Sequence, residues 1–200
     1  MRVGDEAEFE GHMLEVTLGP GMLSRNYDGL QNDLDKMEGV FLRRGEYTFP
    51  LDNDKLWDFK PLAKVGDKVA AGGWLGEVDE NFQPHKIMVP FTFKGEYTVK
   101  SLKEAGQYTI GEVIAVLTDE AGKDVEVTMI QRWPVKRAIT CYKEKPRPYK
   151  LLETGVRTID TVNPIVEGGT GFIPGPFGTG KTVLQHAISK QAEADIVIIA

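Results

Sequence analysis

Hydrophobic and polar positions alternate over short stretches in the N-terminal part of the chain. Residues 13–18 alternate in this way and predict a half-buried β-strand, which Gly19-Pro20-Gly21 ends. Residues 27–30, with the sequence Tyr-Asp-Gly-Leu, predict a turn. From about residue 38 to residue 132, short apolar segments recur between Gly, Asp and Pro residues, a spacing typical of a small β-sandwich or barrel. The strands predicted there are 46–49, 68–69, 74–78, 86–90, 96–102, 111–117 and 125–130.

A weak internal repeat lies within this strand-rich zone. In the first copy, Gly66–Val69 leads through Gly72 to Leu75–Val78; in the second, Gly106–Thr109 leads through Gly111 to Ile114–Leu117. Two related hairpins that face each other would make a pseudo-symmetric sandwich.

The pattern changes after about residue 133. Residues 170–173 are a short apolar stretch closed by Pro174, and they predict the end of a strand. Residues 181–191 have the apolar face of an amphipathic helix, and 196–200 form a continuous apolar run typical of a buried parallel strand. The order strand, loop, helix, strand predicts a βαβ unit.

The loop before this helix carries the clearest chemistry. Its sequence, Gly175 to Thr182, fits the phosphate-binding pattern G-x-x-x-x-G-K-[ST]. Glycines let the backbone N–H groups approach a phosphate, and a helix N-terminus adds free amides and a positive dipole end. We expect Lys181 to be the catalytic residue of this loop, neutralising charge on the β- and γ-phosphates, and the Thr182 hydroxyl to bind Mg²⁺. The predicted contacts to ATP or ADP are Gly175, Pro176, Phe177, Gly178, Thr179, Gly180, Lys181, Thr182 and Val183.

Composition narrows the remaining classes of function. The chain is 41% hydrophobic and 27% charged, which is ordinary for a globular protein, and its net charge of −6 gives no basic footprint for nucleic acid. No apolar run reaches the ~20 residues of a membrane-spanning helix, and the acidic start does not fit a signal peptide. The single cysteine, Cys141, excludes an internal disulfide, and the three histidines lack metal-ligand spacing.

A second hypothesis comes from residues 65–78. Their sequence resembles the turn-and-strand pattern of biotinyl and lipoyl carrier domains, which hold a cofactor on a hairpin lysine. Lys86 is the nearest candidate, although it lacks the flanking residues of either carrier. The alternative is therefore a non-catalytic β-rich docking or carrier module with a vestigial phosphate loop.

Several segments resemble the catalytic A subunit of V-type and A-type rotary ATPases. The resemblance is carried by Leu152–Gly169 before the loop, by Pro176 and Phe177 within it, and by residues 15–23, 27–31, 85–90 and 131–135. The fold it implies is mixed α/β: an incomplete P-loop NTPase (RecA-like) unit with a large all-β, barrel-sandwich-like insertion. The implied domains are 1–37 (end of an N-terminal barrel and first part of the nucleotide domain), 38–132 (insertion) and 133–200 (connector and nucleotide domain).

The resemblance also implies function and partners. Such subunits alternate with B subunits in a ring, contact central and peripheral stalks, and couple ATP hydrolysis or synthesis to H⁺ or Na⁺ transport. They are cytoplasmic and reach the membrane only indirectly, through the ion-translocating sector. By this comparison the water-orienting glutamate and the Walker B aspartate lie beyond Ala200, so we expect the 200-residue chain alone to be inactive.

Overall fold

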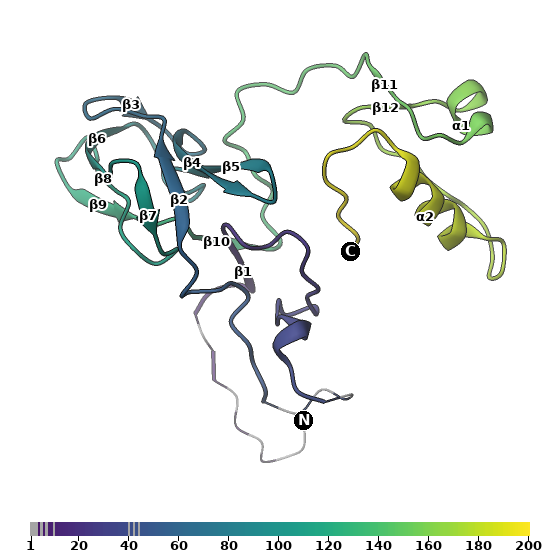
Figure 1. The fold of residues 1–200 in the computed structure, drawn as a ribbon, viewed down its shortest axis with the longest axis horizontal. Helices are drawn as coiled ribbons and strands as arrows, with labels where there is room; N and C mark the ends of the chain where they lie inside the picture. The colour runs from purple at the N-terminus through teal and green to yellow at the C-terminus, as the bar shows by residue number, and fades with distance from the viewer. Residues whose placement is uncertain are drawn as a thin grey trace. The chain divides into compact units, whose positions relative to one another are not determined.

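The computed structural model describes residues 4, 6, 8–9, 11–39, 41, 43 and 45–200 (Figure 1). The chain divides into two compact units, Met1–Tyr142 and Lys143–Ala200. None of the helices in the described part is long and apolar enough to cross a membrane.

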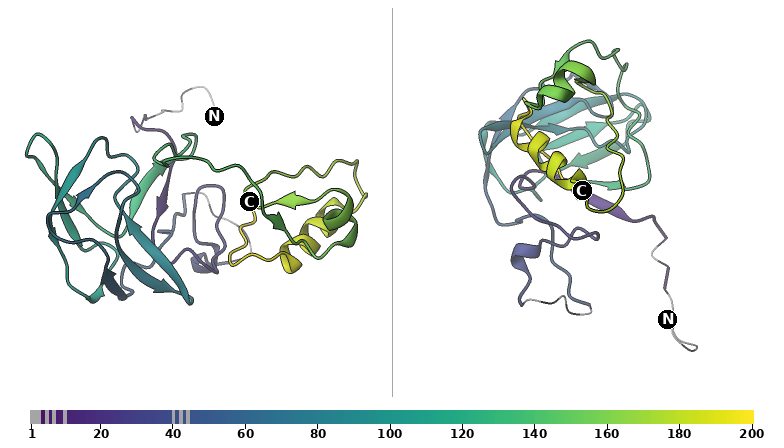
Figure 2. Two further views of the ribbon diagram at one scale, coloured as in Figure 1. Left: turned by 90° about the horizontal axis from the view of Figure 1, so that it is seen from above. Right: turned by 90° about the vertical axis from the view of Figure 1, so that its right-hand side faces the viewer.

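The first unit contains two four-stranded antiparallel sheets, whose strands can be followed from two further directions in Figure 2. One sheet has the order β5-β4-β2-β7, and the other has the order β3-β6-β8-β9. The strands of the first sheet are β2 (Trp57–Pro61), β4 (Trp74–Glu80), β5 (Gln83–Met88) and β7 (Gly106–Tyr108). Those of the second sheet are β3 (Lys68–Val69), β6 (Tyr97–Leu102), β8 (Ala115–Thr118) and β9 (Asp124–Val127).

The two sheets repeat one pairing pattern. If β2, β3, β4 and β5 are exchanged for β6, β7, β8 and β9, the neighbours in one sheet become the neighbours in the other. The first copy of the sequence repeat contains β3 and β4, and the second contains β7 and β8, so each copy crosses from one sheet to the other. The predicted pseudo-symmetric arrangement is confirmed by this topology. The prediction that each copy forms a hairpin is wrong, because the two strands of a copy lie in different sheets and do not pair with each other.

The core of the first unit consists of two apolar clusters, because alternate side chains of a strand point to one face. In β2 the buried positions are Trp57 and Phe59, while Asp58 and Lys60 are exposed. Gly76 in β4 makes room for Phe59, since a Cβ there would lie 2.2 Å from a ring carbon of Phe59. The buried members of the first cluster are Leu51, Trp57, Phe59, Val78, Ile87, Ile110, Ile114 and Met129. Those of the second are Leu75, Val89, Val99, Ala115, Leu117 and Val127.

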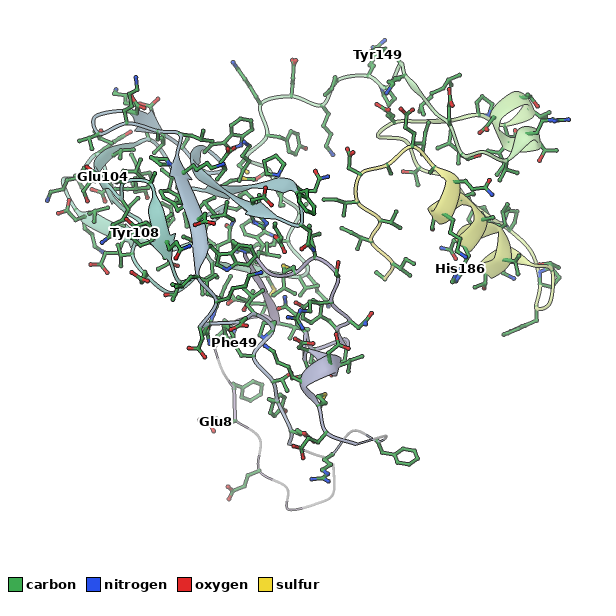
Figure 3. All side chains as sticks on the ribbon, viewed as in Figure 1. Glu8, Phe49, Glu104, Tyr108, Tyr149 and His186 are labelled. Atoms are coloured by element: carbon green, nitrogen blue, oxygen red, sulfur yellow. The ribbon has the colours of Figure 1, made fainter. Side chains whose placement is uncertain are left out.

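At the surface of the first unit, the Tyr108 hydroxyl donates to the carbonyl of Glu104 over 3.2 Å (Figure 3).

The N-terminal segment joins the sandwich through a separate ribbon. The predicted strand at 13–18 is observed as β1 (Glu15–Leu18), which pairs antiparallel with β10 (Gln131–Pro134). The predicted strand at 46–49 is wrong. The amide of Thr48 donates to the Asn32 side chain over 3.0 Å, next to the short helix η1 (Leu34–Lys36), so loop contacts replace a strand ladder.

The second unit is small and holds the predicted helix, α2 (Lys181–Gln191), with the bounds that the sequence indicated. Its other elements are the antiparallel pair β11 (Leu151–Leu152) and β12 (Ile165–Val166), and the short helix α1 (Arg157–Val162). The C-terminal end of α2 lies against the loop after β11, where a Cβ on Gly155 would be 2.7 Å from the Gln191 side-chain oxygen.

The predicted βαβ order around α2 is wrong in this structure. Residues 170–173 and 196–200 form no strand, because neither segment pairs with any described strand. Ile198 and Ile199, expected in a buried strand, are 86% and 74% exposed. Every buried hydrophobic residue of the described part belongs to the first unit, so the second unit has no apolar core of its own.

Candidate functional site

The loop from Gly175 to Gly180 turns directly into the first turn of α2. Gly175, Gly178 and Gly180 have φ angles of 148°, 79° and 82°, which glycine adopts without the steric cost that other residues incur. Gly180 is the N-cap of α2, so the helix starts at Lys181 with its first amides free of helical partners. Gly175 is needed for space as well, since a Cβ there would lie 2.6 Å from the Thr179 hydroxyl oxygen.

Two side chains hold the loop in shape. The Thr179 hydroxyl donates to the carbonyl of Pro176 over 2.8 Å. The Lys181 ammonium folds back over the loop and donates to the carbonyls of Gly175 and Pro176, the latter over 2.7 Å. Both contacts lie at the surface, so the ammonium is accessible to an anion above the loop, although Lys181 as a whole is half-buried. The sequence therefore folds locally into a positively charged cradle.

The cradle borders an open hollow of about 600 Å³. The structure brings together around it all nine of the predicted site residues: Gly175, Pro176, Phe177, Gly178, Thr179, Gly180, Lys181, Thr182 and Val183. The lining contains free amides, two hydroxyl groups and one ammonium group, and it contains no carboxylate. An arrangement of this kind can bind and neutralise a phosphate chain, but its own lining offers no base to orient a water molecule.

The apolar side chains at the site face outward. Phe177 is fully exposed and Val183 is 74% exposed, whereas Leu184, Ala187 and Ile188 on α2 are half-buried. His186 projects from α2 as an exposed side chain (Figure 3).

A contact at the far end of α2 from the loop was not identified from the sequence. Thr154 is fully buried, and its hydroxyl and amide both donate to Asp160 Oδ1 over 2.7 and 3.0 Å. These hydrogen bonds hold the pKa of Asp160 below its usual range, and the bond from the Thr154 hydroxyl contributes most. The Thr154–Asp160 pair therefore holds the loop after β11 in shape. The end of α2 is attached to this loop, because the amide of Glu193 donates to the carbonyl of Glu153 over 3.2 Å. The T-G-x-R-x-I-D spacing was the available signal.

Lys86, the lysine of the carrier hypothesis, lies within β5 rather than at the tip of a hairpin. Its ammonium forms an ion pair with Glu77 on β4 and lies 5.2 Å from the centre of the Trp74 ring. A lysine held across two strands is unlike the projecting hairpin lysine that the hypothesis needs. This placement gives the carrier alternative no support.

Two family models match the chain in its two parts. The model described as "ATPsynthase alpha/beta subunit barrel-sandwich domain" matches residues 48–136. The model described as "ATP synthase alpha/beta family, nucleotide-binding domain" matches residues 155–200. The first span contains both four-stranded sheets, and the second contains the loop Gly175–Gly180 and α2.

Three similar proteins are named as alpha chains of V-type ATP synthases. The V-type ATP synthase alpha chain of Treponema denticola is 50% identical over 203 residues, which cover all of this chain and 34% of that protein. The alpha chain of Borrelia garinii subsp. bavariensis is 50% identical over 201 residues, covering 99% of this chain and 35% of that protein. Alpha chain 1 of Treponema pallidum is 48% identical over 201 residues, covering 99% and 34%. The chain thus spans about a third of the length of these curated relatives. By both matched domains and by this identity along its whole length, the chain belongs to the ATP synthase alpha/beta family.

Proposed function

We propose that this chain is the phosphate-binding part of the catalytic subunit of a V-type or A-type rotary ATPase. The observation that carries the proposal is the loop Gly175–Gly180, whose three positive-φ glycines and folded-back Lys181 form a cradle at the start of α2. The likeness to proteins named V-type ATP synthase alpha chain supports the same assignment.

The residues present fit ATP or ADP with Mg²⁺. The space kept free at Gly175, where a Cβ would collide with Thr179, lets the backbone approach a phosphate closely. In our proposal Lys181 exchanges its carbonyl contacts for the β- and γ-phosphates, and the loop amides hold the phosphate oxygens. The Thr182 hydroxyl is the residue that would bind Mg²⁺, which neutralises phosphate charge when bound.

Turnover needs groups that this cradle does not contain. Phosphoryl transfer requires a group that orients the attacking water and further positive charge at the transition state. Since the lining of the hollow has no carboxylate, we infer that another part of the full subunit supplies the first and a neighbouring subunit the second. The exposed apolar run Ile196–Ala200 would then become a strand of a RecA-like parallel sheet once it has neighbours to pair with.

The assembly we propose follows from the same assignment. This subunit would alternate with B subunits in a ring and contact central and peripheral stalks. It would couple ATP hydrolysis or synthesis to H⁺ or Na⁺ transport from the cytoplasmic side, meeting the membrane only through the ion-translocating sector. The carrier alternative is not favoured by any contact of Lys86.

Calorimetric titration with Mg-ATP tests the proposal in two proteins, the 200-residue chain and a full-length subunit of the relatives' size. We expect weak or no binding by the 200-residue chain, because its second unit lacks an apolar core, and clear binding by the full-length subunit. In the full-length subunit, Lys181→Ala should weaken binding by about tenfold to a hundredfold, as expected for a lost contact to a charged group. Lys190→Ala, an exposed lysine at the other end of α2, is the matched control and should bind normally. Equal binding by the two variants would overturn the proposal.

A further inference from the structure

A buried carboxylate in the first unit joins the sandwich to the N-terminal segment. Glu80, at the end of β4, is 3% exposed. Its Oε1 accepts hydrogen bonds from the amides of Gly21 and Leu23, over 2.8 and 2.9 Å. Its Oε2 lies 2.7 Å from Nδ1 of His85 on β5. The Glu80 carboxylate is thus hydrogen-bonded both to a loop more than 50 residues away in the sequence and to the facing strand of its own hairpin.

The loop that Glu80 holds follows β1 directly. Since β1 pairs with β10, the ribbon fixes the start of this loop, and Glu80 fixes it again at Gly21 and Leu23. Gly21 has a φ of 104°, and a Cβ on it would lie 3.5 Å from the buried Trp57 ring, so the loop passes close over the core. The contact between the Asn81 and Ser24 side chains, at 3.4 Å, is long and exposed. Glu80 therefore provides the main polar attachment of the loop to the β4–β5 hairpin.

Other titratable and charged groups lie around Glu80. A hollow of about 260 Å³ beside it is lined by side chains from the loop and from the segment before β2. The titratable and charged groups that face Glu80 are Arg25 and Tyr27 of the N-terminal segment, Asp52 and Lys55 before β2, and His85 on β5.

We propose that Glu80 is the positioning residue of an acid-sensitive joint: with His85 it holds the 19–23 loop on the sandwich, and its protonation releases the loop. A carboxylate accepts all of these hydrogen bonds only while it is ionised. Protonation turns one oxygen into a donor that faces other donors, so the buried contact becomes unfavourable.

The direction of the pH response follows from the contacts. Burial by itself raises the pKa of Glu80, but the hydrogen bonds from His85, Leu23 and Gly21 outweigh it and hold the pKa below its ordinary value of 4.5. A carboxyl group whose pKa is lowered by folding stabilises the folded form above its unfolded pKa, and this contribution is lost as the pH falls through the folded pKa. The joint should therefore stay closed at neutral pH and open below pH 4.5.

The amides of Gly21 and Leu23 report on the joint directly. We would record ¹⁵N amide shifts and hydrogen exchange of the 200-residue chain between pH 7 and pH 3. Both amides should be protected at pH 7 and should shift together with one midpoint below 4.5. Glu80→Gln should speed their exchange at pH 7 by about tenfold or more and remove this midpoint. Glu77→Gln is the control, since Glu77 lies on the same strand in an ion pair with Lys86, and it should leave both amides unchanged.

A second variant keeps the proposal testable if Glu80→Gln does not fold. His85→Asn removes one of the contacts that lower the pKa of Glu80, so the midpoint seen at Gly21 and Leu23 should move upward. Two results would overturn the proposal. One is exchange at these amides that is equal in the Glu80 and Glu77 variants. The other is a midpoint that does not move in His85→Asn.

Discussion

The glycines of the phosphate loop give the most direct prediction about the site. Gly178 and Gly180 have φ angles near 80°, and a Cβ on either would meet nothing within 4 Å. The cost of Gly180→Ala is therefore the backbone cost alone, about 1–2 kcal/mol for a left-handed conformation. When the empty loop of the variant relaxes to another conformation and the ligand restores this one, that cost enters the binding free energy and weakens binding about fivefold to thirtyfold.

Gly175→Ala should cost more, because its Cβ would also lie 2.6 Å from the Thr179 hydroxyl oxygen. Gly171→Ala is the control, since Gly171 lies just before the loop, has no positive φ, and a Cβ on it would lie 3.6 Å from Cδ1 of Ile165, an ordinary contact distance. The assay is the dissociation constant of Mg-ADP for full-length subunits that carry each change. If Gly180→Ala binds Mg-ADP as tightly as Gly171→Ala, the loop does not hold phosphate in the conformation described.

Two further predictions concern the stability of the sandwich, measured by thermal unfolding of the 200-residue chain. Gly76→Ala should destabilise the sandwich by about 3 kcal/mol or more, because the new Cβ would lie 2.2 Å from the buried Phe59 ring. The control is Gly111→Ala, which should change stability by under about 1 kcal/mol because a Cβ there meets open space. Equal melting temperatures for these two variants would contradict the packing described. Phe82→Gly should stabilise the sandwich by about 1 kcal/mol, because Phe82 is 95% exposed and has a φ of 66° in the turn after Asn81, where glycine is favoured. A lower melting temperature for this variant would refute the strain argument.

Local signals in the sequence predicted the elements that depend on local contacts. The bounds of α2 were predicted correctly, because its start follows the loop glycines and its apolar positions recur with the period of a helix. All nine site residues lie in one continuous segment, so the loop pattern alone was enough to bring them together. The sequence repeat indicated the pseudo-symmetry because each copy carries its own pair of strands.

Non-local contacts could not be read in the same way. The apolar run 196–200 has the composition of a buried strand, but a strand forms only where neighbours supply its hydrogen bonds, and none of the described strands does so. β10 pairs with β1 across more than 100 residues, and Glu80 meets Gly21 at a separation of 59. β2 was not predicted from the sequence. Its apolar residues Trp57 and Phe59 alternate with polar ones, but the strand ends at Pro61, so the alternation is too short to identify it.

Whether this loop is the catalytic phosphate site is decided by the ATP turnover of the assembled complex with a single lysine changed in this subunit. We expect Lys181→Ala to abolish turnover, because that ammonium is the only cation among the residues that line the cradle. Lys190→Ala, on the same helix but away from the loop, should keep normal turnover. Undiminished ATP hydrolysis by a complex carrying Lys181→Ala would contradict the claim that this loop is the catalytic phosphate site.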